Sequence, residues 1–194
     1  MRTQTLVWLG LILLVGCVLI GVSQCGYNKL QAMSSLENKS AEIEGEFTSV
    51  DHISTGTLAT LMTANEKGAV PLLIVDTRAP DEFAISKIPG AVNLESAADV
   101  SEYLKTADPK PETIAVYCSV GYRSAVVVDE LNKAGVKNAK NVRGSIFAWA
   151  NEDRNLVTPG GEPANKVHPF NEFWGRLVKE EKQADLEKMD STNQ

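Results

Sequence analysis

Residues Thr113 to Ser124 read Thr-Ile-Ala-Val-Tyr-Cys-Ser-Val-Gly-Tyr-Arg-Ser, and this stretch leads from an apolar run into a loop that contains a cysteine and a glycine. The run before Cys118 is typical of a buried strand, and the following segment, which Gly135 ends, has the length of a helix. A thiol between a strand end and a helix start lies near the positive end of the helix and near unpaired backbone N–H groups, which favour the thiolate. Cys118 is therefore the candidate nucleophile. The alternative interpretation is a small apolar residue that fills a strand end.

Other candidate residues surround this cysteine. Arg123 adds a permanent positive charge that would hold an anionic substrate beside the sulfur, and Gly121 permits a positive φ inside the loop. Asp76 and Arg78 follow a second apolar run and are supporting candidates. Asp76 would either stabilise the loop or cap the next turn. Arg78 would either face the active-site crevice near the strand end or pair with Glu82, four residues later.

Apolar runs of strand length alternate with helical segments along the chain, which predicts an α/β fold with a parallel sheet. Apolar residues follow one another in these runs without alternating with polar ones, as in strands that are buried on both faces. Strands are expected at residues 47–50, 72–75, 91–94, 113–117 and 140–142. Helices are expected from a cap at Ser54 to an end at Lys67 and Gly68, and at residues 80–85, 97–105 and 124–134. A final helix is expected from Phe170 to Met189, with Phe173, Trp174 and Leu177 packed on the domain.

The chain begins with an apolar segment. Leu6 to Val22 contains no charged side chain, follows Arg2, and is at the short end of what crosses a bilayer. We expect a membrane anchor or signal in residues 1–25, and favour an uncleaved helix. Residues 14–17, Leu-Val-Gly-Cys, resemble the lipobox of bacterial lipoproteins, so a lipoprotein anchored at Cys17 is the alternative. The signal-like layout favours a single-pass protein of the inner (cytoplasmic) membrane with its domain on the periplasmic or extracytoplasmic side.

After this segment the chain is polar and acidic. We expect a polar spacer over residues 26–46, one folded domain over residues 47–157, and a C-terminal extension with a helix and a disordered tail over residues 158–194. A formal net charge of −6 without a basic stripe argues against nucleic acid as a partner. Cys118 is the only cysteine after Cys25, so the domain forms no internal disulfide. His52 and His168 lack metal-ligand spacing with the cysteines, and no metal or cofactor is expected.

Taken in order, these segments resemble the rhodanese-like sulfurtransferase domain. Residues 76–78 (Asp-Thr-Arg), 82–83 (Glu-Phe) and 88–93 (Ile-Pro-Gly-Ala-Val-Asn) resemble its N-terminal signature. Residues 118–124 (Cys-Ser-Val-Gly-Tyr-Arg-Ser) resemble its active-site loop, and residues 142–145 (Val-Arg-Gly-Ser), with Trp149, its closing segment. The resemblance implies a five-stranded, mainly parallel sheet flanked by helices, with the cysteine loop at the carboxyl ends of the strands. Ser86 and Lys87 depart from the Gly-His pair that the family often has.

The resemblance also implies a chemistry. Cys118 would take a sulfur atom from a donor such as thiosulfate or a persulfide, hold it as a cysteine persulfide, and pass it to a thiol or to cyanide. Backbone N–H groups would surround the anionic sulfur, and Arg123 would orient the donor. The loop residues given this role are Ser119, Val120, Gly121, Tyr122, Arg123 and Ser124.

Two other functions remain open at this point. A non-catalytic rhodanese module would bind a partner or sense redox state through Cys118. A cysteine-dependent phosphatase or arsenate reductase would need one more residue between Cys118 and Arg123 than the four present here. The expected partners are a small sulfur-containing substrate or a thiol acceptor protein, and the membrane.

Overall fold

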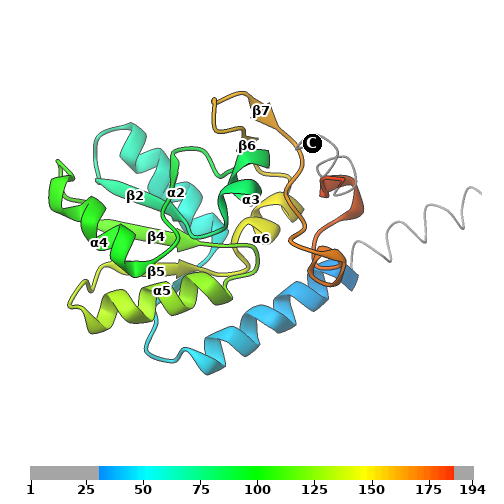
Figure 1. The fold of residues 1–194 in the computed structure, drawn as a ribbon, viewed down its shortest axis with the longest axis horizontal. Coiled ribbons are helices and arrows are strands. Elements are labelled where there is room, and N and C mark those ends of the chain that lie inside the picture. The colour runs from blue at the N-terminus through cyan, green and yellow to red at the C-terminus, as the bar shows by residue number, and fades with distance from the viewer. Residues whose placement is uncertain (1–30, 186–194) are drawn as a thin grey trace, which may run out of the picture.

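A five-stranded parallel sheet forms the centre of the molecule (Figure 1). The computed structural model of the chain describes residues 31–185. Every pair of neighbouring strands in this sheet is parallel, so the sheet is wholly and not only mainly parallel. The predicted α/β fold with five strands is confirmed. In spatial order, the strands are β1 (His52–Ile53), β5 (Ala139–Val142), β4 (Thr113–Tyr117), β2 (Leu72–Asp76) and β3 (Ala91–Asn93).

Helices cover both faces of the sheet. On one face lie α4 (Ala97–Thr106) and α5 (Tyr122–Lys133), and on the other lie α2 (Thr55–Glu66) and α6 (Ser145–Asn151). The short helix α3 (Pro80–Ile85) follows β2. Beyond α6, the chain forms an antiparallel pair, β6 (Leu156–Val157) with β7 (Pro163–Ala164), then α7 (Glu172–Gly175) and a 3₁₀ helix (Glu180–Lys182).

The central position of β4 in the sheet explains why its sequence is a continuous apolar run. Ile114 and Val116 pack into the core beneath α4 and α5, whereas Ala115 and Tyr117 pack into the core on the opposite face. Successive side chains of a strand point to opposite faces, so a strand in the middle of a covered sheet needs apolar residues at every position. The same burial explains α5, where the β-branched residues Val127 and Val128 are helical because both are buried against the sheet.

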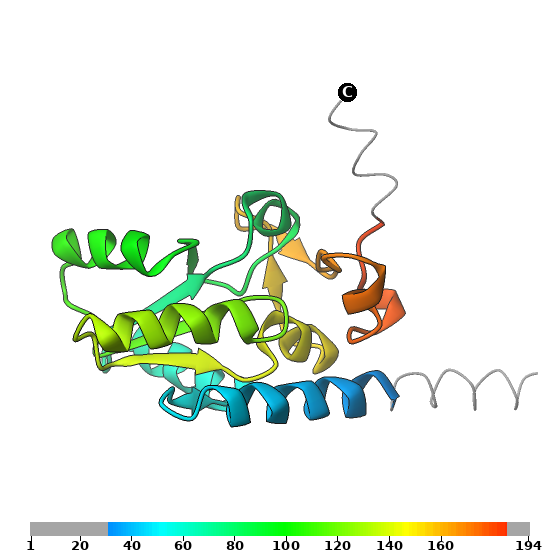
Figure 2. The same ribbon diagram turned by 60° about the horizontal axis from the view of Figure 1, so that its bottom comes forward.

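A helix over residues 31–46, here called the 31–46 helix, lies along the domain (Figure 2). Its buried side chains, at helical spacing, are Ala32, Leu36, Ser40 and Ile43. Where a polar spacer was expected, the described part of that segment is therefore a helix with one face in the core. This helix lies against Gly144 at the start of α6, where a Cβ would be 3.5 Å from Ser40 Oγ. Glycine is required there by the turn into α6 itself, because φ is 65° and a Cβ would lie 2.7 Å from that of Ala148.

Two expected elements differ from the structure. Phe47 to Val50 form a turn, and the first strand begins at His52. The final helix expected from Phe170 is, within the described residues, only α7 and the 3₁₀ helix. Asn171 caps α7 by accepting the N–H of Trp174, and Phe173 is 66% exposed instead of packed. Trp174 and Leu177 do pack against the core.

Across residues 31–185, no helix combines the length and the apolar character needed to cross a membrane. The expected anchor, Leu6 to Val22, and the alternative lipid attachment site, Cys17, lie outside the described residues. So does the tail after residue 185.

The docking of the 31–46 helix can be tested by truncating a buried side chain. We expect Leu36→Ala to lower the free energy of unfolding by about 3 kcal/mol, because it removes buried methyl groups and leaves a cavity. Met33→Ala is the matched control, since Met33 is on the same helix but 42% exposed, and its effect should stay below about 0.5 kcal/mol. Guanidinium unfolding followed by circular dichroism measures both. Equal midpoints for the two variants would mean that the helix does not contribute to the core.

Candidate active site

Cys118 comes directly after β4, at the carboxyl edge of the sheet, and only 1% of its surface is exposed. Its backbone N–H donates a hydrogen bond to Ser145 Oγ (3.1 Å), and that hydroxyl donates to the carbonyl of Val142 (3.0 Å). Its sulfur accepts the N–H of Gly121, at 3.2 Å. The loop therefore folds back on the cysteine, and a main-chain N–H points at the sulfur.

The helix α5 begins within the loop. It starts at Tyr122, two residues before the expected start at Ser124, with Gly121 as its N-cap residue. No side chain of the described residues caps this end, so its first N–H groups and the positive end of its dipole remain available to a negative charge in the loop. The positive φ expected at Gly121 is confirmed, at 113°. Asn141 supports the turn from behind by donating from Nδ2 to the Gly121 carbonyl (3.0 Å).

A buried carboxylate holds Arg123. Both terminal nitrogens of Arg123 donate to Glu82, with distances of 2.8 and 2.9 Å, and Nη2 also donates to Ser119 Oγ at 2.9 Å. The Ser119 hydroxyl and the backbone N–H of Ala79 donate to Glu82 as well. Glu82 is 2% exposed and lies on α3. The guanidinium expected to bind a free anion is therefore already paired with a protein carboxylate.

This pairing changes the titration of both side chains. Burial raises the pKa of Glu82, but the hydrogen bonds from Arg123 and Ser119 outweigh it and bring the pKa below its ordinary value. Burial lowers the pKa of Arg123, but its hydrogen bonds to Glu82 and its interaction with the Cys118 side chain raise it above the ordinary value. Arg123 thus interacts with both Glu82 and Cys118.

Asp76 and Arg78 form a second ion pair, fully buried beneath the site. Arg78 Nη2 lies 2.7 Å from Asp76 Oδ2 and 2.6 Å from the carbonyl of Ser86. The expectation that Arg78 pairs with Glu82 is wrong, because Glu82 pairs with Arg123. Arg78 is also too deeply buried to face the crevice. Asp76 caps the turn after β2, which was one of its two expected roles, because its Oδ1 accepts the N–H of Arg78 at 3.0 Å. The pair thereby fixes the chain between β2 and α3, the helix that carries Glu82.

The remaining loop residues take several positions. Tyr122 is partly exposed, packs edge-on against Phe47 (5.4 Å between ring centroids), and donates from its hydroxyl to Glu46. Val120 and Ser124 are buried, and among the described residues the hydroxyl of Ser124 has no hydrogen-bond partner.

Glu82 and Ser145 were missed as site residues. Glu82 stands beside Phe83 in a recognisable motif, but no sequence signal showed that its partner would be Arg123, 41 residues away. Ser145 stands in the closing segment, and only its position next to Cys118 reveals its role.

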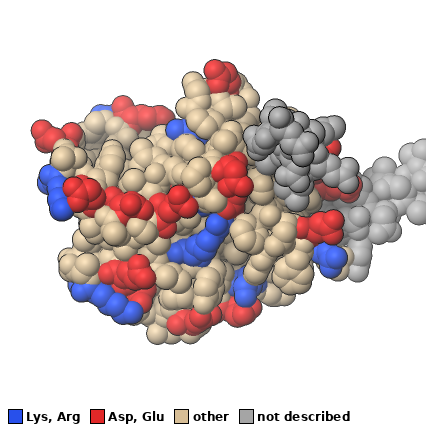
Figure 3. Space-filling view, in the orientation of Figure 1, with Lys and Arg blue, Asp and Glu red and all other residues tan. Residues whose placement is uncertain are grey.

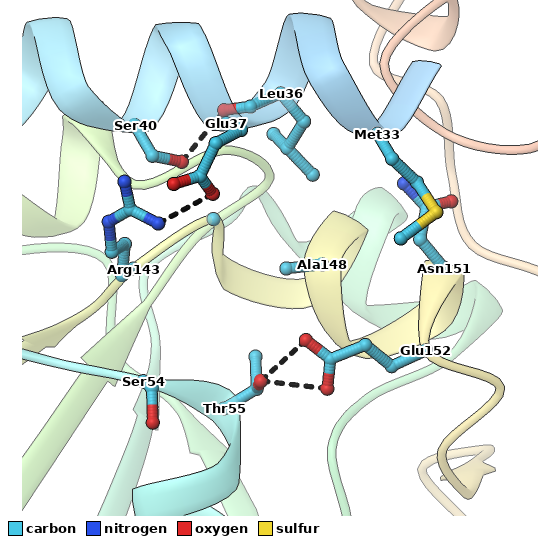
Figure 4. A pocket seen from close by; sticks show the side chains of 11 residues that line it. Met33, Leu36, Glu37, Ser40, Ser54, Thr55, Arg143, Ala148, Asn151 and Glu152 are labelled. Atoms are coloured by element: carbon cyan, nitrogen blue, oxygen red, sulfur yellow. Dashed lines mark hydrogen bonds and ion pairs between the residues drawn. The ribbon is translucent and has the colours of Figure 1, made fainter. Parts of the chain in front are cut away.

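Away from the cysteine loop, a pocket lies between the 31–46 helix and α6 (Figure 4). Its volume is about 150 Å³. Each polar side chain that lines it already has a hydrogen bond within the protein: Arg143 donates to Glu37, Thr55 to Glu152, and Asn151 to the carbonyl of Leu177. The polar groups that line this pocket are therefore satisfied without a ligand, and we interpret the pocket as a gap in the packing between the two helices. Within residues 31–185, no group of three or more His, Cys, Asp or Glu side chains is placed to hold a metal ion.

The Glu82 pair can be tested by removing its charge while keeping its shape. We expect Glu82→Gln to lower the free energy of unfolding at pH 7 by about 2 kcal/mol, less than the roughly 3–5 kcal/mol for a fully buried pair, because solvent screens the exposed part of Arg123. Asp81→Asn, at an exposed neighbouring position, is the control and should change it by less than about 1 kcal/mol. Denaturant unfolding of the three proteins gives the comparison.

The stability difference between the wild type and Glu82→Gln should depend on pH. The pKa of Glu82 in the folded protein lies below its ordinary value of 4.5, so its stabilising contribution is complete above that pH and is lost as the pH falls through the folded pKa. The difference between wild type and Glu82→Gln should therefore shrink in acid. A difference that grows as the pH falls would contradict the pairing.

Known proteins share this sequence and architecture. A family model described as the rhodanese-like domain matches residues 57–152. A sulfurtransferase of Allochromatium vinosum is 33% identical over 90 residues, covering 46% of this chain and 82% of that protein. A probable adenylyltransferase/sulfurtransferase of Mycobacterium tuberculosis, MoeZ, is 33% identical over 81 residues, covering 42% of this chain but 21% of that protein.

The fold also matches a solved structure. The thiosulfate sulfurtransferase of Pseudomonas aeruginosa aligns with a TM-score of 0.53 over 73% of this chain and 26% of that chain, and at 19% identity this likeness concerns the fold alone. The sequence match to the Allochromatium protein spans most of that relative, and the family model covers the segment from α2 to the end of α6. The chain therefore belongs to the rhodanese-like family.

Proposed function

We propose that the chain is a sulfurtransferase that relays sulfane sulfur through Cys118. The observation that carries this proposal is the contact between the Cys118 sulfur and the Gly121 N–H, at the uncapped start of α5 with Arg123 beside it. A main-chain N–H, a helix N-terminus and a guanidinium all stabilise negative charge on sulfur. They would stabilise both the thiolate and, on its outer sulfur, the persulfide anion.

The proposed reaction has two displacement steps. The Cys118 thiolate attacks the outer sulfur of the donor, the sulfur–sulfur bond of the donor breaks, and the donor leaves with the electron pair, as sulfite if the donor is thiosulfate. An acceptor thiolate or cyanide then attacks the outer sulfur of the Cys118 persulfide, and the Cys118 thiolate is the leaving group. Neither step needs an external oxidant or reductant.

The charges around the loop favour a donor of low charge. Arg123 is neutralised by Glu82, and Ser119 and Val120 add no positive charge. The face drawn in Figure 3 carries several groups of acidic side chains, and no continuous basic stripe crosses it. A dianion such as thiosulfate gains little in such surroundings. A small persulfide is therefore the donor that we favour.

One observation supports a second candidate function. The thiol is almost fully covered, which suits a non-catalytic module that binds a partner or senses redox state through its surface and exposes Cys118 only on binding.

Mass spectrometry and a sulfur-transfer assay separate the two candidates. Full-length protein is incubated with glutathione persulfide or with thiosulfate, its intact mass is measured, and cyanide is then added. We expect the wild type to gain the mass of one sulfur atom, to lose it to cyanide as thiocyanate, and to react faster with the persulfide. Cys118→Ser is the control. Wild type and Cys118→Ser behaving alike would leave only the non-catalytic module.

We also propose, from the sequence alone, that Leu6 to Val22 attaches the chain to the inner membrane with the domain on the periplasmic side. Because Cys118 is buried, a new cysteine is the better probe of this topology. The side chain of Lys105 is 68% exposed, on a helix remote from the site. Lys105→Cys should react with a membrane-impermeant maleimide in intact cells, above the background of the wild type. Protection of Lys105→Cys until lysis would place the domain on the other side.

A further inference from the structure

The C-terminal extension reaches the candidate active site. Val167 is fully buried and anchors the segment, because its N–H donates to the carbonyl of Lys182 (2.8 Å) and its carbonyl accepts the N–H of Ala184 (2.9 Å). The next residue, His168, is 7% exposed and interacts electrostatically with Glu82 and Arg123. In Figure 1 this part of the ribbon, in orange and red, lies beside α6 at the edge of the sheet.

Phe170 has an unusual backbone for its residue type. Its φ of 67° is in the left-handed region, which bulky side chains rarely adopt. The conformation is held by His168, whose Nδ1 accepts the N–H of Phe170 at 2.9 Å. Strained conformations of this kind persist where the surroundings fix them, and they occur often at functional sites. Phe170 is also 44% exposed, so filling the core does not explain its placement.

The strained conformation directs the ring toward the cysteine loop. The Phe170 ring lies over the guanidinium of Arg123, with 5.1 Å from Arg123 Cζ to the ring centroid, which is within the range of a cation–π contact. Glu82 and Ser119 hold the same guanidinium, and it interacts with the Cys118 sulfur. The ring thus covers the guanidinium that interacts with the thiol.

We infer that Phe170, held in place by His168, determines which reagents reach Cys118. By packing on Arg123 it covers the guanidinium that Glu82 and Ser119 hold near the almost fully buried thiol, so that narrow reagents enter and bulky ones do not. Taken together with the proposed sulfur transfer, on which this consequence rests, the donors and acceptors are low-molecular-weight persulfides, thiols and cyanide. A folded protein thiol would require displacement of residues 168–170.

Alkylation rates test this inference without relying on sulfur transfer. Full-length protein, with detergent present, is reacted with iodoacetamide or with the bulkier fluorescein-5-maleimide, and the modification of the peptide that contains Cys118 is followed by mass spectrometry. The ratio of the two rates is normalised to that of free glutathione. Phe170→Ala should raise the normalised maleimide-to-iodoacetamide ratio by about tenfold, the factor that corresponds to about 1.4 kcal/mol of barrier.

Three further variants make the result decisive. Phe170→Gly removes the ring and accepts a positive φ without strain, so it should fold and give the same increase. His168→Ala frees the backbone of Phe170 and should give a smaller increase. Phe173→Ala is the matched control, because Phe173 is exposed in the same extension and packs on Trp174 instead of Arg123.

The inference would be overturned if the normalised ratio for both Phe170 variants stayed within about twofold of the wild-type ratio, because so small a change does not reflect a removed steric barrier. An equal increase in Phe173→Ala would also overturn it. If the ratio rises as expected but no persulfide ever forms on Cys118, the role of Phe170 in access stands and the proposed sulfur transfer fails.

Discussion

The cysteine loop depends on one buried carboxylate. Glu82 on α3 accepts hydrogen bonds from the two ends of the Arg123 guanidinium, from the hydroxyl of Ser119 and from the N–H of Ala79. It thereby joins a helix after β2 to the loop after β4, two segments that are distant in sequence. A buried carboxylate without such donors would be strongly unfavourable, so the loop and α3 stabilise each other. The Asp76–Arg78 pair beneath it fixes the chain that leads into α3.

The consequence for chemistry is a site with directed dipoles and little net charge. Because Glu82 neutralises Arg123, the Gly121 N–H and the start of α5 stabilise a negative charge on the sulfur without adding net positive charge to the site. Fixed main-chain dipoles stabilise a small, polarisable anion such as a persulfide without attracting polyanions from solution. Family membership and site geometry therefore lead to the same proposal, and the geometry adds a preference among donors.

Much of the fold could be predicted because local sequence and tertiary burial agree. The runs at Leu72–Asp76 and Thr113–Tyr117 are apolar at every position, as central strands must be, and Gly121 occupies the one loop position with a left-handed backbone. The partners of charged residues could not be predicted. Arg78 has a sequence neighbour, Glu82, at helical spacing, yet it pairs with Asp76, because the direction of a side chain after a strand end depends on the packing of the whole domain.

The structures of the extension and of the 31–46 helix could not be predicted from the sequence for the same reason. Their contacts are long-range, such as Arg143 with Glu37, and their apolar residues are few and widely spaced. The packing of Trp174 and Leu177 was predicted from their apolar character, but the chain path of the extension and the docking of the 31–46 helix were not.

The rigid attachment of the 31–46 helix has a mechanical meaning. A flexible tether would let the domain rotate freely, but sixteen helical residues form a rod of about 24 Å that is fused to the domain surface. The rod contacts Gly144, and the next residue, Ser145, holds the backbone of Cys118. The axis of this helix and the direction in which the reactive sulfur faces are therefore fixed relative to each other.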